Sequence, residues 1–216
     1  MNKLLTEVIG TFILVFTICM VSLGNFPNAA LVIGASLMVA VYMGGHVSGA
    51  HYNPAVSLGL WMRGKLPSKD LVPYWVSQLI GAVAASLLAW SIHGKTFAPA
   101  PGESVRAIEA LFTEATFTFI LVLVVLNVAC TKATEGNSYY GLAIGFTIAV
   151  GAAAGGNISG GAYNPAVGLG PTIVNAMNGG SFGNVWLYLV GPFTGGSLGA
   201  IVYAIQHGEP VMKRGD

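Results

Sequence analysis

The chain has 216 residues, of which 54% are hydrophobic and only 8% are charged. An average soluble domain carries about 25% charged residues, so the deficit of charge indicates a membrane protein. The net charge of +1 leaves no basic stripe to neutralise phosphates, which excludes a nucleic-acid partner.

Eight apolar stretches are predicted to be helices. A helix needs about 20 apolar residues to cross a bilayer core, and six of the stretches are that long. They cover roughly residues 4–23, 29–47, 71–92, 107–130, 139–156 and 184–206. Two more, roughly 53–62 and 164–176, are too short to span. We therefore predict an all-α membrane protein with six transmembrane helices and two re-entrant half-helices, in a single domain over residues 1–216.

The two short helices begin with one repeated motif. Tyr52–Gly59 and Tyr163–Gly170 both have the sequence Tyr-Asn-Pro-Ala-Val-x-Leu-Gly. Asn is a favoured N-cap because its side chain binds free N–H groups of the first turn. Pro suits the first helical position, where no N–H is needed. Asn53 and Asn164 are therefore predicted to start two matched half-helices.

The repeat extends beyond this motif. Thr6–Phe16 aligns with Thr113–Leu123, and Gln78-x-x-Gly81-Ala82 aligns with Pro192-x-x-Gly195-Gly196. The pseudo-repeats cover about 1–92 and 107–207. Each contains three spans, an odd number, so the second is inverted in the membrane. Inverted repeats place the functional site at their interface, near the bilayer midplane.

Basic residues set the orientation, because cytoplasmic loops carry an excess of Lys and Arg. With six spans, both termini lie on one side, together with seven of the nine basic residues. These seven are Lys3, Arg63, Lys65, Lys69, Lys132, Lys213 and Arg214. We predict a multi-pass protein of the cell membrane with both termini in the cytoplasm.

The loops before the half-helices carry the chemistry. Non-helical backbone survives at membrane depth only when it is buried in protein or lines a wet cavity. Gly44–Tyr52 and Gly155–Tyr163 are rich in glycine, and their carbonyls can form rows of acceptors. Each half-helix N-terminus carries roughly +0.5 of an elementary charge, so two that face each other repel cations. The Asn53 and Asn164 amides remain as donors, which predicts passage of neutral polar solutes.

With this doubled motif and its inverted setting, the chain resembles the major intrinsic proteins, the aquaporins and aquaglyceroporins. The resemblance covers nearly the whole chain, and selectivity by half-helix dipoles is a known device of aquaporin-type pores. It implies that Asn53 and Asn164 are midplane donors, that Glu7 and Glu114 brace the loops, and that the protein is a homotetramer in a lipid bilayer. It also implies pore-lining carbonyls at Gly49, Ala50, His51, Tyr52, Gly160, Gly161, Ala162 and Tyr163.

The outer constriction of the family maps onto Ile33, Ala152, Gly161 and Val167. The family usually has Arg at the position of Val167. Some plant vacuolar members have Val there, as this chain does. Arg would offer five fixed donors and a permanent charge, and Val offers neither. The sequence therefore predicts a wide, apolar outer mouth.

Three functions stay open. The first is a passive channel for water and small neutral solutes, such as glycerol, urea, ammonia or hydrogen peroxide. The second is a strict water channel narrowed by the loop 93–106. The third is a secondary transporter, which would need a coupling-ion site that the sequence does not provide. No catalytic residues, metal site or cofactor are predicted, because the sequence contains no nucleophile–base pair or metal-ligand cluster, and the protein is not expected to be an enzyme.

Overall fold

The computed structural model describes residues 2–213, and the regular elements of that part of the chain are helices joined by loops. In chain order the α-helices are α1 (Asn2–Leu23), α2 (Ala29–Ser48), α3 (Pro54–Met62), α4 (Ser68–His93), α5 (Ala107–Val125), α6 (Tyr140–Ser159), α7 (Pro165–Met177) and α8 (Val185–Gln206). A π-helical turn, Leu126–Cys130, extends α5, and a 3₁₀ turn follows at Lys132–Thr134. The predicted class, six long helices and two half-helices, is confirmed.

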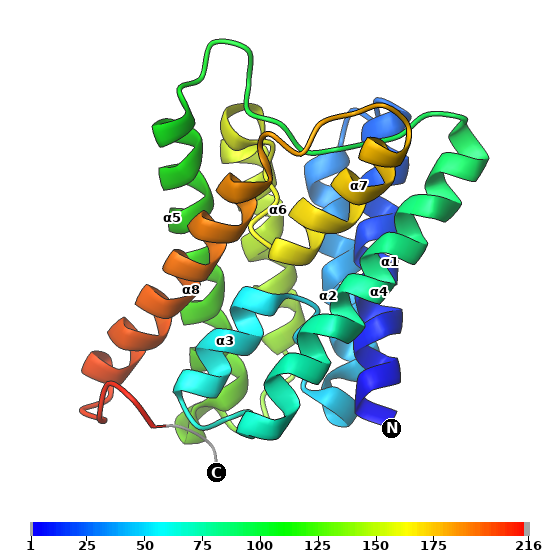
Figure 1. Cartoon of the computed structure of the whole chain (residues 1–216). Coiled ribbons are helices and arrows are strands. Elements are labelled where there is room, and N and C mark those ends of the chain that lie inside the picture. The colour runs from blue at the N-terminus through cyan, green and yellow to red at the C-terminus, as the bar shows by residue number, and fades with distance from the viewer. Residues whose placement is uncertain (1, 214–216) are drawn as a thin grey trace.

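Six helices are long and apolar enough to cross a membrane. They stand side by side in one bundle (Figure 1). Many of their large apolar side chains are exposed. Val72, Phe112 and Ile205 are 59%, 64% and 69% exposed. So much exposed apolar surface is unfavourable in water but fits a lipid environment. The high apolar fraction of the sequence therefore supplies a lipid-facing surface as well as a core.

Glycines let the long helices pack closely. Gly81 of α4 lies against the Val8 carbonyl of α1, and Gly195 of α8 lies against the Ala115 carbonyl of α5. Gly199 similarly lies against the Phe119 carbonyl, at a distance where a Cβ would sit 2.9 Å from its oxygen. Small residues at helix interfaces are the usual way to pack membrane helices. The equivalent pairs α1–α4 and α5–α8 thus form by the same contact in the two halves.

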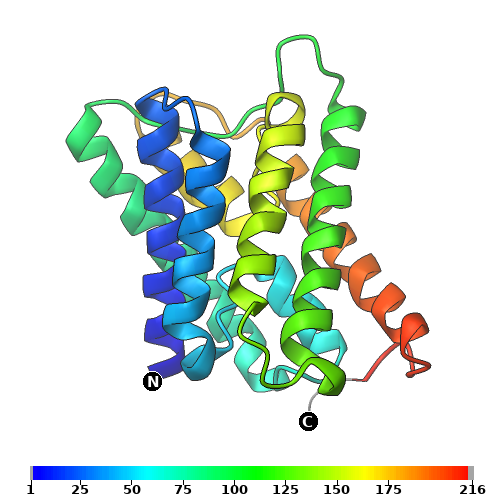
Figure 2. The same cartoon turned by 180° about the vertical axis from the view of Figure 1, so that it is seen from behind.

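Each half-helix packs mainly against a long helix of the other half of the chain. α3 packs more extensively against α8 than against α4, and α7 packs more extensively against α4 than against α8. Both lie inside the ring of long helices and meet near its middle (Figure 1). Viewed from behind, α2 and α6 lie side by side and complete the ring (Figure 2). The boundaries of the two pseudo-repeats remain a prediction.

α1 begins and α3 ends at the same end of the bundle (Figure 1). Lys3 belongs to the first turn of α1, and Arg63 and Lys65 follow α3, so we call this end the basic end. The chain returns to this end after α8, so both described ends of the chain lie on one side, as six spans require. Arg214, one of the seven basic residues counted above, lies outside the described residues.

Candidate pore between the two half-helices

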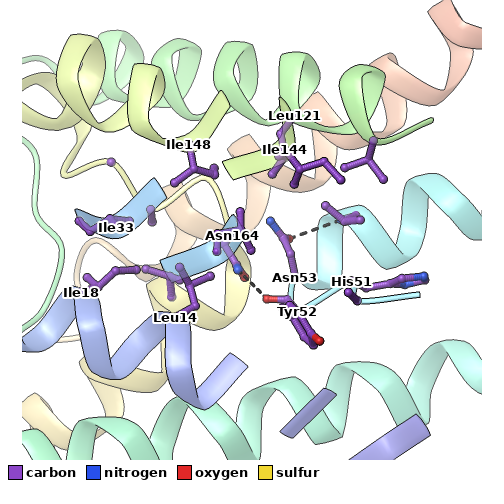
Figure 3. Close-up of a pocket in the computed structure, with 17 residues that line it drawn as sticks. Leu14, Ile18, Ile33, His51, Tyr52, Asn53, Leu121, Ile144, Ile148 and Asn164 are labelled. Atoms are coloured by element: carbon purple, nitrogen blue, oxygen red, sulfur yellow. Dashed lines mark hydrogen bonds between the residues drawn. The ribbon is translucent and has the colours of Figure 1, made fainter. Parts of the chain in front are cut away.

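Asn53 and Asn164 cap the two half-helices and also bind each other's loops. Both have extended backbones, with φ of −157° and −158°. The Asn53 side-chain oxygen accepts from the Ala55 N–H at 2.9 Å, and that of Asn164 accepts from Ala166 N–H at 2.9 Å. Each Nδ2 then donates to the loop of the other half. Asn53 donates to the Tyr163 carbonyl at 2.9 Å, and Asn164 donates to the Tyr52 carbonyl at 2.8 Å, the bond drawn between these two residues in Figure 3. Since an amide nitrogen carries two hydrogens, each side chain keeps one donor.

The loops before the asparagines have an unusual backbone. Tyr52 and Tyr163 have φ of +50° and +49°, in the left-handed region that bulky residues avoid. Such a conformation costs about 1–3 kcal/mol and persists only where surrounding contacts enforce it. The same strain at matched positions of both loops indicates that it serves the site. Its effect is to turn the two tyrosine carbonyls toward the opposite asparagine.

A buried carboxylate holds the first loop in place. Glu7 is fully buried, and its Oε1 accepts from the His51 N–H at 3.0 Å and from the Ser48 hydroxyl at 2.7 Å. Its Oε2 accepts from the Tyr52 N–H at 2.7 Å and from Gln78 Nε2 at 2.8 Å. Four donors satisfy both oxygens, which fits the desolvation of this side chain.

Glu114 holds the second loop with three donors. Its Oε1 accepts from the Ser159 hydroxyl at 2.7 Å and the Ala162 N–H at 3.0 Å, and its Oε2 accepts from the Tyr163 N–H at 2.6 Å. The fourth donor is missing because Pro192 aligns with Gln78 in the second half. Both loops are therefore held by a buried glutamate, but the first glutamate accepts four hydrogen bonds and the second accepts three.

The side chains of Tyr52 and Tyr163 anchor the loops in the bundle. Both are fully buried, and their hydroxyls donate to the carbonyls of Ala40 at 3.0 Å and Gly151 at 2.8 Å. A Cβ on Gly10 would overlap the Tyr52 ring. Glycine is needed there because the ring passes directly over the helix backbone.

A narrow cavity lies where the half-helices meet. Its volume is about 20 Å³, and roughly 10–15 Å³ measured in this way holds one water molecule. The amides of Asn53 and Asn164 face it together with His51 and Tyr52, and the rest of its wall is glycine, alanine and larger aliphatic side chains (Figure 3). The aliphatic wall consists of Leu14, Ile18, Ile33, Leu37, Val56, Leu121, Val125, Ile144, Ile148 and Val167.

Three of the four predicted constriction residues, Ile33, Gly161 and Val167, line this cavity. Ala152 does not line it; it is half-buried, one turn of α6 beyond Ile148, which does. Nothing in the sequence singled out Ile148, because its place depends on how α6 packs.

Five of the eight residues predicted to supply carbonyls line the cavity: Ala50, His51, Tyr52, Gly161 and Ala162. Gly49 lines only the vestibule described next. Gly160 and Tyr163 line neither space; Gly160 lies beneath Ala100 of the loop over the outer end, and the Tyr163 carbonyl accepts the Asn53 bond.

A vestibule of about 1010 Å³ opens at the basic end. His51 and Ile144 line both the vestibule and the cavity, so they lie where the two spaces adjoin. The His51 ring is buried, with Nδ1 3.0 Å from the Ser57 hydroxyl and the Tyr74 ring 5.0 Å away. A molecule that moves from the vestibule into the cavity would therefore pass the His51 imidazole.

Arg63 was expected to be a loop charge, and the structure buries it completely. Its Nη1 donates to the Pro210 and Val211 carbonyls at 2.6 and 3.1 Å, and Nη2 pairs with Glu209. The Lys213 N–H also donates to the Met62 carbonyl at 2.9 Å. The segment that follows α8 is thus tied to the end of α3, a contact that no local pattern in the sequence indicates.

Six membrane-spanning helices, with two half-helices meeting around a narrow central cavity, define a membrane channel of the aquaporin type. The model of the family described as Major intrinsic protein matches residues 1–203, and the chain belongs to that family. Members of this family are passive channels, so the protein is a channel for water and small solutes and not an enzyme.

Similar proteins come from plants, bacteria and a parasite. Aquaporin NIP1-1 of Zea mays is 35% identical over 94% of this chain and 73% of its own length. Glycerol uptake facilitator protein-like 6 of Lactiplantibacillus plantarum is 32% identical over 97% of this chain and 100% of its own. The X-ray structure of the aquaglyceroporin from Plasmodium falciparum superposes with a TM-score of 0.84 at 26% identity, covering 94% of each chain.

Proposed function

We propose that the protein conducts water together with small neutral solutes, with glycerol, urea, ammonia and hydrogen peroxide as the candidates, and that it excludes cations. The proposal depends on one observation: Val167 lines the cavity at the position where the family usually has Arg. Without the guanidinium the outer part of the pore has no fixed charge and no side-chain donor. Among its relatives are one named a glycerol uptake facilitator-like protein and one titled an aquaglyceroporin.

The backbone gives solutes their hydrogen bonds. The carbonyls of Ala50, His51, Gly161 and Ala162 receive no hydrogen bond from another residue within 2–213. Buried carbonyls are normally paired, so these need a partner that the chain does not supply. Permeating molecules in single file would accept hydrogen bonds from the Asn53 and Asn164 amides and donate hydrogen bonds to these carbonyls.

Cation exclusion follows from the two half-helices. Their N-termini meet at the asparagines, where each contributes roughly +0.5 of an elementary charge. The nearest carboxylates, Glu7 and Glu114, are each engaged by three or four donors and are not free to attract a cation. The same engagement argues against a coupling-ion site, and so against a secondary transporter.

A strict water channel is the second candidate, favoured by the cavity volume of about 20 Å³, which fits a single water molecule. The loop 94–106 crosses the outer end and is fixed there by a bond from the Gly102 N–H to the Ile158 carbonyl at 3.1 Å. None of residues 94–106, all of which the structure describes, lines the cavity.

We further propose a homotetramer in the cell membrane with the basic end in the cytoplasm. The exposed apolar sides of the helices offer surface both to lipid and to neighbouring subunits. Protease protection of tags at either end, and the mass of the purified complex, test these two proposals.

Stopped-flow light scattering on proteoliposomes decides between the candidates. Osmotic gradients of an impermeant sugar report water flux, and gradients of glycerol or urea report solute flux in the same vesicles. Fast re-swelling with glycerol or urea supports the broad channel. Water flux without solute flux supports the strict water channel instead.

A further inference from the structure

We infer that Ile148, rather than Ala152, is the residue of α6 that sets the size limit of the pore. This inference rests on the proposed solute permeability. It places the narrowest part of the solute path one helical turn deeper than the family-based constriction, within the central cavity itself.

The first argument is the register of α2 against α6. The two helices run antiparallel, as the colours in Figure 2 show. A Cβ built on Gly34 would lie 2.6 Å from both the Ala149 Cβ and the Gly145 carbonyl oxygen, and one on Gly145 would lie 2.6 Å from the Met38 Cβ. Because the two helices are antiparallel, these contacts make Ile33 level with position 150 of α6. Ile148 therefore lies about 3 Å closer to the asparagines than Ile33, and Ala152 lies about 3 Å farther out, so that one helical turn separates the two candidate residues.

The second argument is the size of the side chains at each height. Ala152 carries only one methyl group and does not line the cavity. At Ile148 the wall presents a branched side chain that is only 8% exposed and is packed in the core. Ile33, Ile148 and Val167 all line the same cavity of about 20 Å³ (Figure 3). Three β-branched residues around so small a space leave little freedom to rotate aside.

The glycine contact makes this wall stiff. Because Gly34 and Gly145 bring the two helix backbones together, α6 cannot move away from α2 without leaving a gap. The space available to a solute is then set by the side chain at position 148. Glycerol and urea are larger than water, so they feel this limit most.

The test measures the ratio of glycerol to water permeability in proteoliposomes for Ile148→Ala, Ala152→Gly and Val150→Ala. Val150 is 58% exposed on the outer face of α6, so its truncation controls for a general effect on the helix. We expect Ile148→Ala to raise the ratio roughly tenfold, the low end of what small steric differences contribute in apolar sites. Ala152→Gly and Val150→Ala should leave it unchanged. Ile148→Phe should lower glycerol flux more than water flux.

Each outcome has a defined meaning. An unchanged ratio in Ile148→Ala, or an equal rise in Ala152→Gly, overturns the assignment of Ile148. If Ile148→Ala does not yield a monodisperse protein, Ile148→Val replaces it, with a smaller rise expected and an unchanged ratio again overturning the assignment. Wild-type vesicles that pass neither water nor solute overturn the proposed function itself.

Discussion

The Asn53 Nδ2 donates a hydrogen bond to the Tyr163 carbonyl, 110 positions away in the chain, while Asn164 returns the same bond to Tyr52. Each half-helix is thus positioned by the loop of the other half. The pair of bonds leaves one N–H on each asparagine and fixes both side chains where the two half-helices meet.

Replacing Asn164 with Asp should weaken cation exclusion. The carboxylate can still cap α7, but it loses the donor to Tyr52 and adds a full negative charge, which offsets the roughly +0.5 charges of two helix N-termini. Sodium currents across planar bilayers, measured at alkaline pH, should rise above those of the wild type. Asn164→Ala serves as the neutral control and should not admit sodium. Unaltered exclusion in Asn164→Asp, with water flux retained, would show that the dipoles are not the barrier.

Replacing Val167 with Arg should reduce glycerol and urea flux and leave water flux largely intact. The residue is buried at the cavity wall, so a guanidinium there adds both bulk and fixed donors. Stopped-flow assays of the three permeants give the result. Val167→Met adds length without charge and separates the two contributions. Undiminished solute flux in Val167→Arg would mean that this side chain lies outside the solute path.

The two loop carboxylates should differ in their contribution to stability. A Gln at position 7 must turn an NH₂ group toward two of the four donors, whereas at position 114 it can face Tyr163 N–H alone. An unsatisfied buried polar group costs about 1–3 kcal/mol. We expect both variants to unfold at lower temperature in detergent, and Glu7→Gln at a lower temperature than Glu114→Gln. The reverse order would contradict the hydrogen-bond arrangement described here.

Gly10→Ala should prevent the first loop from forming. The added methyl would overlap the Tyr52 ring, which lies between two helices and cannot retract. Thermal stability and water flux should both fall sharply. Gly156→Ala is the matched control, because a Cβ there meets nothing within 4 Å and alanine favours the helix by up to about 1 kcal/mol. Equal behaviour of the two variants would refute the packing argument.

The tie between Arg63 and Glu209 should depend on pH. The hydrogen bond from Arg63 holds the pKa of Glu209 below its usual value. A carboxylate with a lowered pKa stabilises the folded state above its unfolded pKa, and that contribution disappears as the pH falls through the lower folded pKa. Glu209→Gln should therefore melt below the wild type at pH 7, with the gap closing in acid. A gap that persists at pH 3 would place the effect elsewhere.

The sequence predicted the elements well because they depend on local signals. Asn-Pro at 53–54 predicted the start of α3, and the apolar runs predicted the six long helices. α4 begins at Ser68, a few residues before the predicted 71, because its first turn contains Lys69 and Asp70 and lies outside the apolar run. The π-helical turn at Leu126–Cys130 had no sequence signal that we recognised.

The parts that were not predicted depend on tertiary contacts. Ile148 lines the cavity because Gly34 and Gly145 set the register of two helices that are far apart in sequence. Arg63 is buried because the segment after α8 returns to cover it. Counting residues from a motif identifies the equivalent position in the sequence, but it does not show which side chain of the helix narrows the pore.

Glycerol-driven swelling of wild-type proteoliposomes, compared with empty vesicles, tests the central claim most directly. The account predicts fast swelling whose rate rises in proportion to the gradient, without saturation and without a coupled ion, as passive diffusion through a pore requires. Swelling no faster than that of empty vesicles, or uptake that saturates and depends on an ion gradient, would contradict it.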